Sequence, residues 1–338
     1  MLLKGEDPDK IKFGSTLSEY GFEPDLKFNF MLTNPPYGTS WKQDMENLNV
    51  GSEKKISIVD KRFNLKIKNF KGELEETCLT SRSNDGQLMF MLHMLSKMKD
   101  PKDGGSRIAS VQNGSALFTG DAGSGESGIR QYIIENDLLE CIVQLPNDIF
   151  YNTGIATYVW FISNVKEEKR KGKVQLINAS SNEFYQKMRK SLGSKRNELT
   201  STHIEAIQEM YFAFEENQYS KIFDNEDFGF YQISVHQPEK DEKGIIILDS
   251  KGKLKSDSSL KDIENVPMKD SIPDYFKKEV LPFAPDAWYD KTKMKVGYEI
   301  AFNKYFYKYE GLRSLSAIAA DILLLEQETD GLLKEIIE

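Results

Sequence analysis

The sequence predicts an α/β protein built on a largely parallel sheet, followed by a mostly helical carboxyl-terminal extension. Three observations support this fold class. Short apolar runs typical of strands alternate with segments of helical spacing through the first two thirds of the chain. Polar, turn-forming sequences come directly after several of these runs, where open α/β sheets bind their ligands. After about residue 200 the alternation stops, and the chain ends in one long amphipathic segment.

The predicted strands are short runs rich in β-branched and aromatic residues, which favour a buried, pleated surface. In chain order they comprise residues 28–33, 107–111, 140–145, 157–162 and 174–178. The sequences at 34–37, 112–114 and 146–155 each come just after a predicted strand. Because the carboxyl ends of parallel strands meet at one edge of a sheet, we expect these three sequences to converge there.

Two segments between the strands have helical spacing. Residues 87–99 place apolar side chains on one face after a possible cap at Asn84 or Asp85, and residues 129–136 show a similar pattern. Each is long enough for a helix of two or more turns.

Two other stretches are predicted to be loops. Residues 38–79 are polar and without periodicity, which is typical of a long functional or mobile loop. Residues 119–128 are rich in Gly and Ser, which predicts an exposed loop.

The last third of the chain has a different character. It is predicted to contain a helix, a strand, a hairpin, a second helix and a terminal helix, at residues 201–211, 228–235, 245–255, 274–280 and 313–338. The terminal helix has an apolar stripe that fits either its own domain or a partner. The stripe consists of Leu315, Ile318, Ile322, Leu325, Leu332 and Ile336.

Composition excludes several classes of protein. No apolar run reaches the roughly 18 residues that a membrane span needs, and the first residues lack the layout of a secretory signal. Cys78 and Cys141 are too few for a disulfide framework or a four-ligand zinc site, so no metal site is expected. These features predict a cytoplasmic protein. With 45 Lys and Arg against 53 Asp and Glu, the net charge of −8 is poorly suited to holding nucleic acid unaided.

One segment has the opposite charge. From Lys166 to Arg196, ten basic residues face three acidic ones, and Phe184 and Tyr185 lie among them. Such a basic band could follow a phosphate backbone, and the alternative is a solvated loop and helix face. Its candidate DNA-backbone contacts are Lys187, Arg189, Lys190, Lys195 and Arg196.

The sequence Asn34-Pro35-Pro36-Tyr37 is suited to positioning an exocyclic amine. The amine of adenine is a poor nucleophile because its lone pair is delocalised into the ring. Hydrogen bonds accepted from its two N–H groups push the nitrogen toward tetrahedral geometry. The Asn34 side-chain oxygen and the Pro35 carbonyl are two neutral acceptors, and the prolines fix the backbone. Tyr37 offers a ring on which a flipped-out base can stack. The simpler alternative is a turn after a strand.

This motif resembles the catalytic motif of amino-group methyltransferases that use S-adenosylmethionine. Alone it would also suit protein-glutamine or ribosomal-RNA guanine methyltransferases. Residues 145–157, and residues 296–302 with Phe306 and Tyr307, resemble two signatures of the modification subunit of type I restriction-modification systems. The resemblance runs from residue 1 to 338.

The resemblance implies a partial, Rossmann-like S-adenosylmethionine-dependent methyltransferase sheet. It implies methyl transfer from S-adenosylmethionine to N6 of a flipped-out adenine at a specific site in double-stranded DNA. The catalytic residues would be Asn34, Pro35, Pro36 and Tyr37. Tyr37 would stack on one face of the target base, and Phe150 or Tyr151 would cover the other.

The resemblance also implies a domain organisation and a set of partners. Residues 1–200 would be the carboxyl-terminal part of the catalytic domain, 201–290 a mixed α/β extension, and 291–338 a helical partner-binding segment. The expected partners are a second modification subunit, a specificity subunit that reads the DNA, and a translocating restriction subunit. The terminal helix would pack against the specificity subunit.

The chain departs from this family in its cofactor signature. The family has an Asp/Glu-Pro/Phe-x-x-Gly-x-Gly turn upstream of the catalytic motif, and the 33 residues before Asn34 contain no such turn. The glycines between 120 and 128 follow the catalytic strand and do not replace it. We therefore expect an amino-terminally truncated copy of a longer protein, with an open edge on the strand before Asn34. Cofactor-binding residues stay unassigned, and weak or absent S-adenosylmethionine binding is expected for this chain alone.

Two alternative functions follow from the same observations. A non-catalytic remnant would keep the partner-binding region and serve as an assembly module for the specificity subunit. A methyltransferase acting on RNA or protein would use the same catalytic motif.

Overall fold

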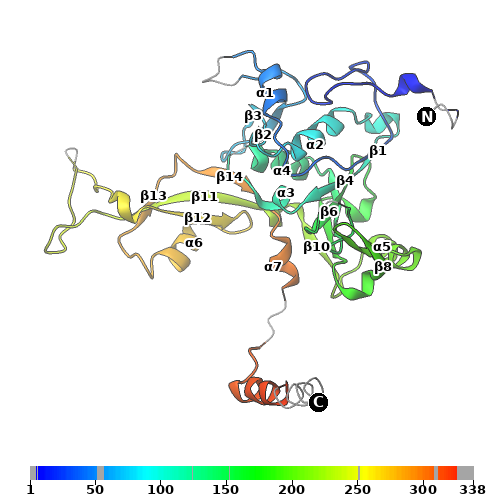
Figure 1. Ribbon diagram of the computed structural model, residues 1–338. Coiled ribbons are helices and arrows are strands. Elements are labelled where there is room, and N and C mark those ends of the chain that lie inside the picture. The colour runs from blue at the N-terminus through cyan, green and yellow to red at the C-terminus, as the bar shows by residue number, and fades with distance from the viewer. Residues whose placement is uncertain are drawn as a thin grey trace. The chain divides into compact units, whose positions relative to one another are not determined.

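The computed structural model describes residues 5, 7–51, 57–123, 125–151, 153–249, 252–307 and 311–325. The chain forms two compact units, Met1–Phe302 and Asn303–Glu338. Among the described residues, no helix is long and apolar enough to cross a membrane. The elements of the first unit are shown in Figure 1.

The first unit is built on a six-stranded sheet with the order β1-β4-β6-β5-β7-β10. Its strands are β1 (Phe30–Thr33), β4 (Arg107–Asn113), β6 (Thr157–Ser163), β5 (Leu139–Gln144), β7 (Lys173–Asn178) and β10 (Ser220–Asp224). β1, β4, β5 and β7 run in one direction, while β6 and β10 run in the other. The predicted α/β class with a mostly parallel sheet is confirmed, as are all five strands predicted in this region.

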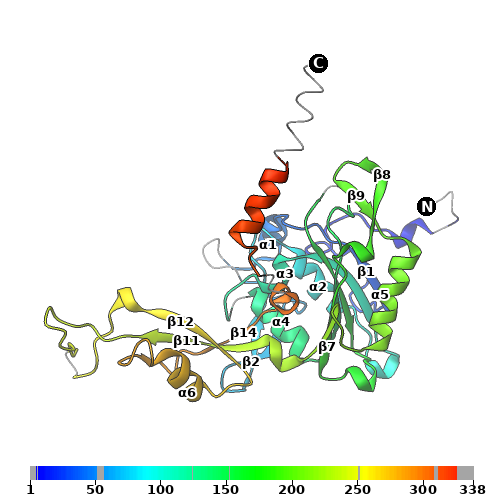
Figure 2. The same cartoon turned by 90° about the horizontal axis from the view of Figure 1, so that it is seen from below.

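Helices cover the two faces of this sheet. α2 (Gln87–Ser96) and α4 (Gly125–Glu135) lie on one face, and α5 (Ser201–Ala213) lies on the other (Figure 2). α5 begins after Thr200, whose hydroxyl accepts a hydrogen bond from the backbone of His203. The N-cap of α2 is Gly86 rather than Asn84 or Asp85, although the Asp85 carboxylate still accepts from the Gln87 backbone N–H at 3.3 Å.

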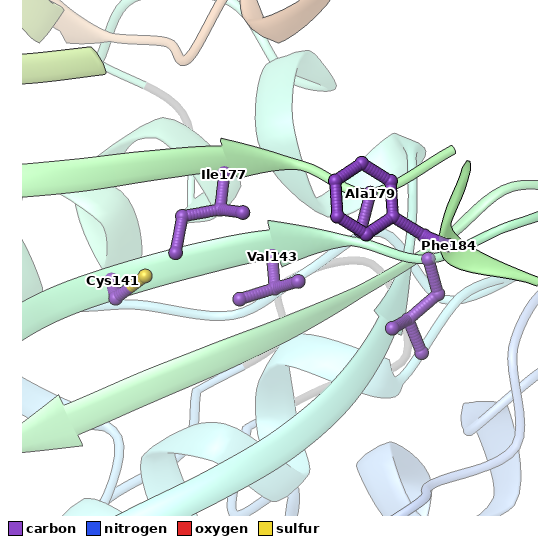
Figure 3. Close-up of a cluster of buried hydrophobic side chains, with 6 residues drawn as sticks. Cys141, Val143, Ile177, Ala179 and Phe184 are labelled. Carbon is purple, nitrogen blue, oxygen red and sulfur yellow. The ribbon is translucent and has the colours of Figure 1, made fainter. Parts of the chain in front are cut away.

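A buried apolar cluster fills the space between the sheet and α5. It is formed from the inward side chains of β5 and β7 and from the loops that follow them (Figure 3), and its members are Cys141, Val143, Leu145, Ile177, Ala179 and Phe184. Burial raises the pKa of the Cys141 thiol well above its usual range, so this cysteine behaves as a small apolar residue. Cys78, by contrast, is exposed.

The predicted long loop at residues 38–79 contains regular structure, so that prediction is wrong. It holds α1 (Lys42–Leu48) and the antiparallel hairpin of β2 (Asn64–Lys68) and β3 (Leu74–Cys78). Most residues of this hairpin are charged or polar, and most of β3 is exposed. A strand without a buried face has no alternating apolar pattern, which explains why the sequence gives no sign of it.

The predicted exposed loop at residues 119–128 is also wrong in its second half. α4 begins at Gly125, and the side chains of Glu126 and Ser127 are buried. A Cβ on Gly125 would lie 1.6 Å from the Thr80 carbonyl oxygen, and one on Gly128 would lie 2.6 Å from the Leu79 side chain. These glycines therefore permit close packing of a helix against a neighbouring backbone rather than loop flexibility.

A second, smaller sheet follows the central one. Its strands are β11 (Gly229–His236), β12 (Asp262–Pro267), β13 (Trp288–Tyr289) and β14 (Lys295–Tyr298). α6 (Ile272–Tyr275) and the π-helical turn Phe276–Val280 close its small core, in which Ile233, Val235 and Val266 are buried. The strand predicted at residues 228–235 and the helix predicted at 274–280 are confirmed. The hairpin predicted at 245–255 is also confirmed, by an antiparallel bridge between Leu248 and Leu254.

Several short elements complete the described structure. The hairpin of β8 (Gln186–Leu192) and β9 (Lys195–Glu198) follows β7, and α3 (Ser115–Phe118) follows β4. α7 (Phe302–Phe306) lies near the carboxyl-terminal end. Single 3-10 turns occur at Pro8–Lys10, Pro101–Asp103, Glu168–Arg170, Asn182–Phe184, Asn225–Phe228 and Ser258–Leu260.

The second unit contains a helical segment at residues 315–325. Leu315, Ile318, Ile322 and Leu325 of the predicted apolar stripe are all exposed on it. Leu332 and Ile336 lie outside the described residues.

Arg130 on α4 joins the two sheets. Its guanidinium is fully buried and donates to the carbonyl oxygens of Tyr298 (2.6 Å), Ala116 (3.1 Å) and Thr119 (2.8 Å). Burial lowers the pKa of Arg130 to about 10, so the group is still charged at neutral pH. The neighbouring Ser127 hydroxyl accepts from the Tyr298 backbone N–H at 2.9 Å. β14 is thereby held against α3 and α4.

The segment before β1 packs on α2 through His93. Its Nδ1 accepts a hydrogen bond from the Arg62 guanidinium at 2.9 Å, and Tyr20 lies edge-on at 4.7 Å between ring centroids. Burial, together with the positive charges of Arg62 and Lys97, lowers the pKa of His93 to about 4. His93 is therefore neutral in the folded protein at pH 7.

This neutral histidine makes stability depend on pH. Between pH 6.5 and 4 the unfolded chain binds a proton at His93 that the folded chain does not, so the free energy of unfolding falls as the pH falls. The free energy of unfolding falls by at most about 1.4 kcal/mol per pH unit, and above pH 6.5 His93 does not make it depend on pH. The free energy of unfolding, measured with urea at several pH values across this range, should fall less steeply with falling pH for His93→Gln than for the wild type. Equal slopes would contradict the assignment.

Candidate active site

The Asn34–Tyr37 motif begins where β1 ends, as predicted. Asn34 is exposed, Pro35 is buried, and Tyr37 is half-buried. Pro35 and Pro36 each have a fixed φ and no N–H, so they restrict the backbone that follows Asn34. The motif therefore presents one side-chain oxygen and one backbone oxygen at the carboxyl edge of the sheet, and both are neutral acceptors.

The Asn34 oxygen already has a partner within the motif. The Tyr37 hydroxyl donates a hydrogen bond to Asn34 Oδ1. Partial burial raises the pKa of Tyr37, and the bond to Asn34 only partly opposes this, so the hydroxyl is a donor at neutral pH. The Asn34 oxygen has a second lone pair and can accept a further hydrogen bond.

The segment after the motif is fixed to the loop that precedes α2. The Thr39 carbonyl accepts from the Gly86 backbone N–H at 3.2 Å, and the Trp41 indole donates to the Arg82 carbonyl at 2.9 Å. A Cβ on Gly86 would lie 2.9 Å from the Trp41 Cβ, so glycine is needed for this close approach.

Gln87 fixes the loop after β4 to the same point. Its side-chain oxygen accepts from the Asn113 backbone N–H at 3.0 Å, and its amide nitrogen lies 2.7 Å from both Asn113 Oδ1 and Ser115 Oγ. The Asp85 carboxylate accepts from both the Gln87 amide and the Ser115 hydroxyl. The residues at the start of α2 thus fix the loops after β1 and β4 relative to each other. The predicted convergence of residues 34–37 and 112–114 is confirmed.

The two candidate stacking rings in the loop after β5 differ in burial. Phe150 is half-buried and packs against the cluster beneath α5, whereas Tyr151 is 58% exposed. β5 stands three strand positions from β1, about 14 Å at the usual strand spacing. Of the two rings, Tyr151 is therefore the one free to meet a ligand at the sheet edge.

The structure divides the basic band into two parts. Residues 166–173 lie between β6 and β7, at the edge opposite Asn34. There Lys166 is buried in an ion pair with Asp137 at 2.6 Å, and Arg170 is buried 3.7 Å from Glu140. For Lys166 and Arg170 the prediction of a contact with a phosphate backbone is wrong, because both side chains are buried in internal ion pairs.

The second part of the band forms the β8–β9 hairpin at the same edge as Asn34. Lys187, Arg189, Lys190 and Arg196 are exposed, and Lys195 is half-buried. None of these five cations forms an ion pair with an acidic side chain in the described part of the chain. They are the residues predicted to contact a DNA backbone, and their charge is available to a ligand.

A cavity of about 470 Å³ adjoins the motif on the α2 side of β1. Thr33 to Pro36 line one wall, and Tyr20, Phe22 and Phe28 line another. Aromatic rings suit an adenine ring, but none of the described residues that line the cavity is an Asp or Glu. S-adenosylmethionine has a sulfonium, an ammonium and two ribose hydroxyls, for which carboxylates are the natural partners. The residues present fit this cofactor only in part.

β1 borders this cavity and forms the free edge of the sheet. In the described structure β1 pairs with β4 alone. Phe30 and Leu32 are 76% and 85% exposed, beside a second cavity of about 350 Å³ on the other face of β1. The predicted open edge is confirmed.

The sequence did not point to Gln87 or to Asn197 on β9. Both are buried polar side chains, and each bonds to a loop that is distant in the chain. In the sequence, Gln87 stands out only as a polar residue at the start of an otherwise apolar helix. No feature of the sequence distinguishes Asn197.

The structure thus places Asn-Pro-Pro-Tyr at the carboxyl end of a strand in an α/β sheet. The chain belongs to the N-6 DNA methylase family, whose model matches residues 1–240.

Similar curated proteins are methylase subunits of type I restriction enzymes. The MjaIX subunit of Methanocaldococcus jannaschii is 28% identical over 224 residues, which cover 64% of this chain and 33% of that protein. The HindI subunit of Haemophilus influenzae is 46% identical over 54 residues, 16% of this chain and 12% of that protein. The chain thus spans a third or less of the length of these relatives.

A similar solved structure is the type I restriction-modification methyltransferase subunit of Streptococcus thermophilus. It is 24% identical, with a TM-score of 0.45, and the match covers 63% of this chain and 38% of that one.

The composition of the cavity beside Asn34 predicts weak cofactor binding. Without a carboxylate for the two cationic groups, the chain alone should bind S-adenosylmethionine with a dissociation constant no tighter than about 1 mM, or roughly 4 kcal/mol. Titration calorimetry on the full chain measures this directly. A micromolar constant would contradict the expectation.

Replacing Gln87 should loosen both loops of the site. Gln87→Met keeps the side-chain volume but leaves the Asn113 N–H and the Asp85 carboxylate without this partner, at a cost of about 2 kcal/mol. Amide hydrogen exchange should become faster at residues 39–41 and 113–115. Gln131→Met is the matched control, because Gln131 is equally buried but bonds to the Lys68 carbonyl instead. Equal acceleration in both variants would show that the effect is only global.

Proposed function

We propose that the chain is the catalytic part of a type I restriction-modification methylase subunit that methylates N6 of adenine in double-stranded DNA. The observation that carries this proposal is the motif at the end of β1, where the exposed Asn34 is followed directly by Pro35 and Pro36. Family membership and the similarity to methylase subunits support the reaction class. The proposed setting is the cytoplasm, where the DNA substrate is found.

In this mechanism the motif acts by positioning and polarisation. The two oxygens accept hydrogen bonds from the adenine N6 amine, which localises its lone pair and directs it toward the methyl donor. Both acceptors are neutral, so the proton that the amine loses on methylation leaves to solvent or to a neighbouring base. Pro36 keeps the Pro35 carbonyl in place, since it has no N–H and a fixed φ.

The flipped-out base is held by stacking. The Tyr37 ring takes one face once its hydroxyl leaves Asn34, and Tyr151 or Phe150 covers the other. Stacking of this kind contributes about 1–3 kcal/mol per base, enough to offset much of the cost of removing the base from the duplex.

The methyl donor proposed is S-adenosylmethionine, which supplies an activated methyl group when bound. The described cavity fits it only in part, so further groups for the cofactor are proposed to come from polypeptide outside this chain. The MjaIX subunit is about three times longer than the segment that it shares with this chain, which is consistent with that proposal.

The proposed assembly follows from the charge distribution. The hairpin cations contact the DNA backbone, while a specificity subunit reads the sequence and binds the exposed stripe of residues 315–325. A second modification subunit and a translocating restriction subunit complete the proposed complex. An acidic chain can then act on DNA because its partners supply most of the attraction.

Methyl transfer in the assembled complex tests the proposal. With labelled S-adenosylmethionine, methylation of duplex DNA should fall about 100-fold or more for Asn34→Ala, because an acceptor for the amine is lost. Tyr37→Phe should stay within about tenfold of the wild type, whereas Tyr37→Ala should lose more activity with its stacking ring. Asn136→Ala is the matched control, since Asn136 is exposed at the opposite edge of the sheet.

Parallel assays on transfer RNA and on protein define the substrate class. Transfer to either of these in place of DNA, or full activity of Asn34→Ala, would refute the proposed function.

A further inference from the structure

We propose that Asn197 fixes the loop at residues 147–151 to the basic β8–β9 hairpin, so that contact with a DNA phosphate backbone and placement of Tyr151 occur together. This inference rests on the proposed function, because it takes the ligand of the hairpin to be DNA. Asn197 is then a positioning residue, and it does not touch the reacting atoms.

Four hydrogen bonds join the loop to the hairpin. The Arg196 and Asn197 backbone N–H groups both donate to the Asp148 carbonyl, at 2.8 and 3.1 Å. The Ser194 N–H donates to the Tyr151 carbonyl at 3.0 Å. The Asn197 side chain donates to the Asn147 carbonyl at 2.9 Å. A loop bonded at three of its five residues moves with the hairpin rather than independently of it.

Asn197 is the one hairpin residue suited to this task. It is buried, in contrast to the exposed cations of the hairpin. Its side-chain bond is shielded from water, so its loss leaves the Asn147 carbonyl without this partner. Glycine at 193 is needed too, because its φ is +61° and a Cβ there would lie 3.1 Å from the Tyr151 carbonyl oxygen.

The side chains add a second connection. The Lys195 ammonium lies 5.1 Å from the centroid of the Tyr151 ring, within the range of a cation–π interaction. Lys195 is thus one of the hairpin cations and also contacts the candidate stacking ring. Phosphates bound by the neighbouring cations leave this contact in place.

The middle of the loop is anchored in the protein core. Ile149 and Phe150 pack against the apolar cluster beneath α5. Tyr151, the next residue, is exposed and meets the hairpin. A short segment fixed at Phe150 and bonded to the hairpin at Tyr151 converts a small displacement of the hairpin into a change in the direction of the Tyr151 ring.

The hairpin has the chemistry for a phosphate backbone. It combines five cations with one acid, Glu198, whose carboxylate accepts from the Gln186 amide. Lys187 and Arg189 are two residues apart on β8, so they point to the same face of the hairpin. Exposed cations without acidic partners gain most from meeting phosphates, with release of counterions.

Hydrogen exchange of the assembled methylase, with and without a mixed-sequence DNA duplex, tests the inference. In the wild type, DNA should slow exchange both in the hairpin, residues 186–198, and in the loop. In Asn197→Leu, DNA should still protect the hairpin, but protection of the loop should fall about tenfold. Gln186→Leu is the matched control, because it removes a side-chain bond within the hairpin and leaves the loop bonds intact.

Salt dependence separates positioning from charge. The slope of log affinity against log salt should be unchanged in Asn197→Leu, which keeps every cation. In the double variant Lys187→Gln with Arg189→Gln, which removes two phosphate contacts, the slope should be less negative by about two.

The outcomes distinguish the two levels of the proposal. A wild-type hairpin whose exchange DNA leaves unchanged would refute the DNA contact, and with it this inference. Protection of the hairpin without protection of the loop in the wild type, or equal protection of the loop in Asn197→Leu, would refute the coupling alone.

Discussion

The buried guanidinium of Arg130 is the interaction on which the arrangement of this protein depends. It donates hydrogen bonds to three backbone carbonyls from two distant parts of the chain. Among the described residues, none of its hydrogen bonds goes to a carboxylate. Any movement of α3 or β14 would leave a buried charge short of acceptors, which costs several kcal/mol. α3 directly follows the loop that Gln87 holds from the other side. The loop after β4 is therefore fixed from two directions, although its own sequence is short and polar.

The candidate site separates neutral acceptors from unpaired cations. The groups offered by the motif are neutral acceptors, and the free cations stand on the hairpin, beyond the end of β7. Two further cations of the band, Lys166 and Arg170, are buried in internal pairs with Asp137 and Glu140. The chain as a whole has a net charge of −8, but its β8–β9 hairpin is locally cationic and the Asn34–Tyr37 motif is uncharged.

The central strands and helices were predictable because burial on both faces imposes continuous apolar sequences. β5 and α2 are examples. The reversed direction of β6 was also open to prediction, since residues 145–156 contain no helical pattern for a parallel crossover. The polar β2–β3 hairpin gave no periodic signal, and Gly125 was mistaken for a loop residue because its close neighbour, Thr80, is distant in the chain. Gln87 and Asn197 could not be predicted, because one sequence does not reveal partners 26 and 50 residues away.

The free edge of β1 bears on the behaviour of the protein in concentrated solution. A strand with unpaired backbone groups and two large exposed apolar side chains, Phe30 and Leu32, is a template for any extended chain of similar character. Self-association through such an edge grows with concentration, and a covering polypeptide suppresses it by taking the same hydrogen bonds. The four residues of β1, which lead directly into the Asn34–Tyr37 motif, thus form an edge at which such association can begin.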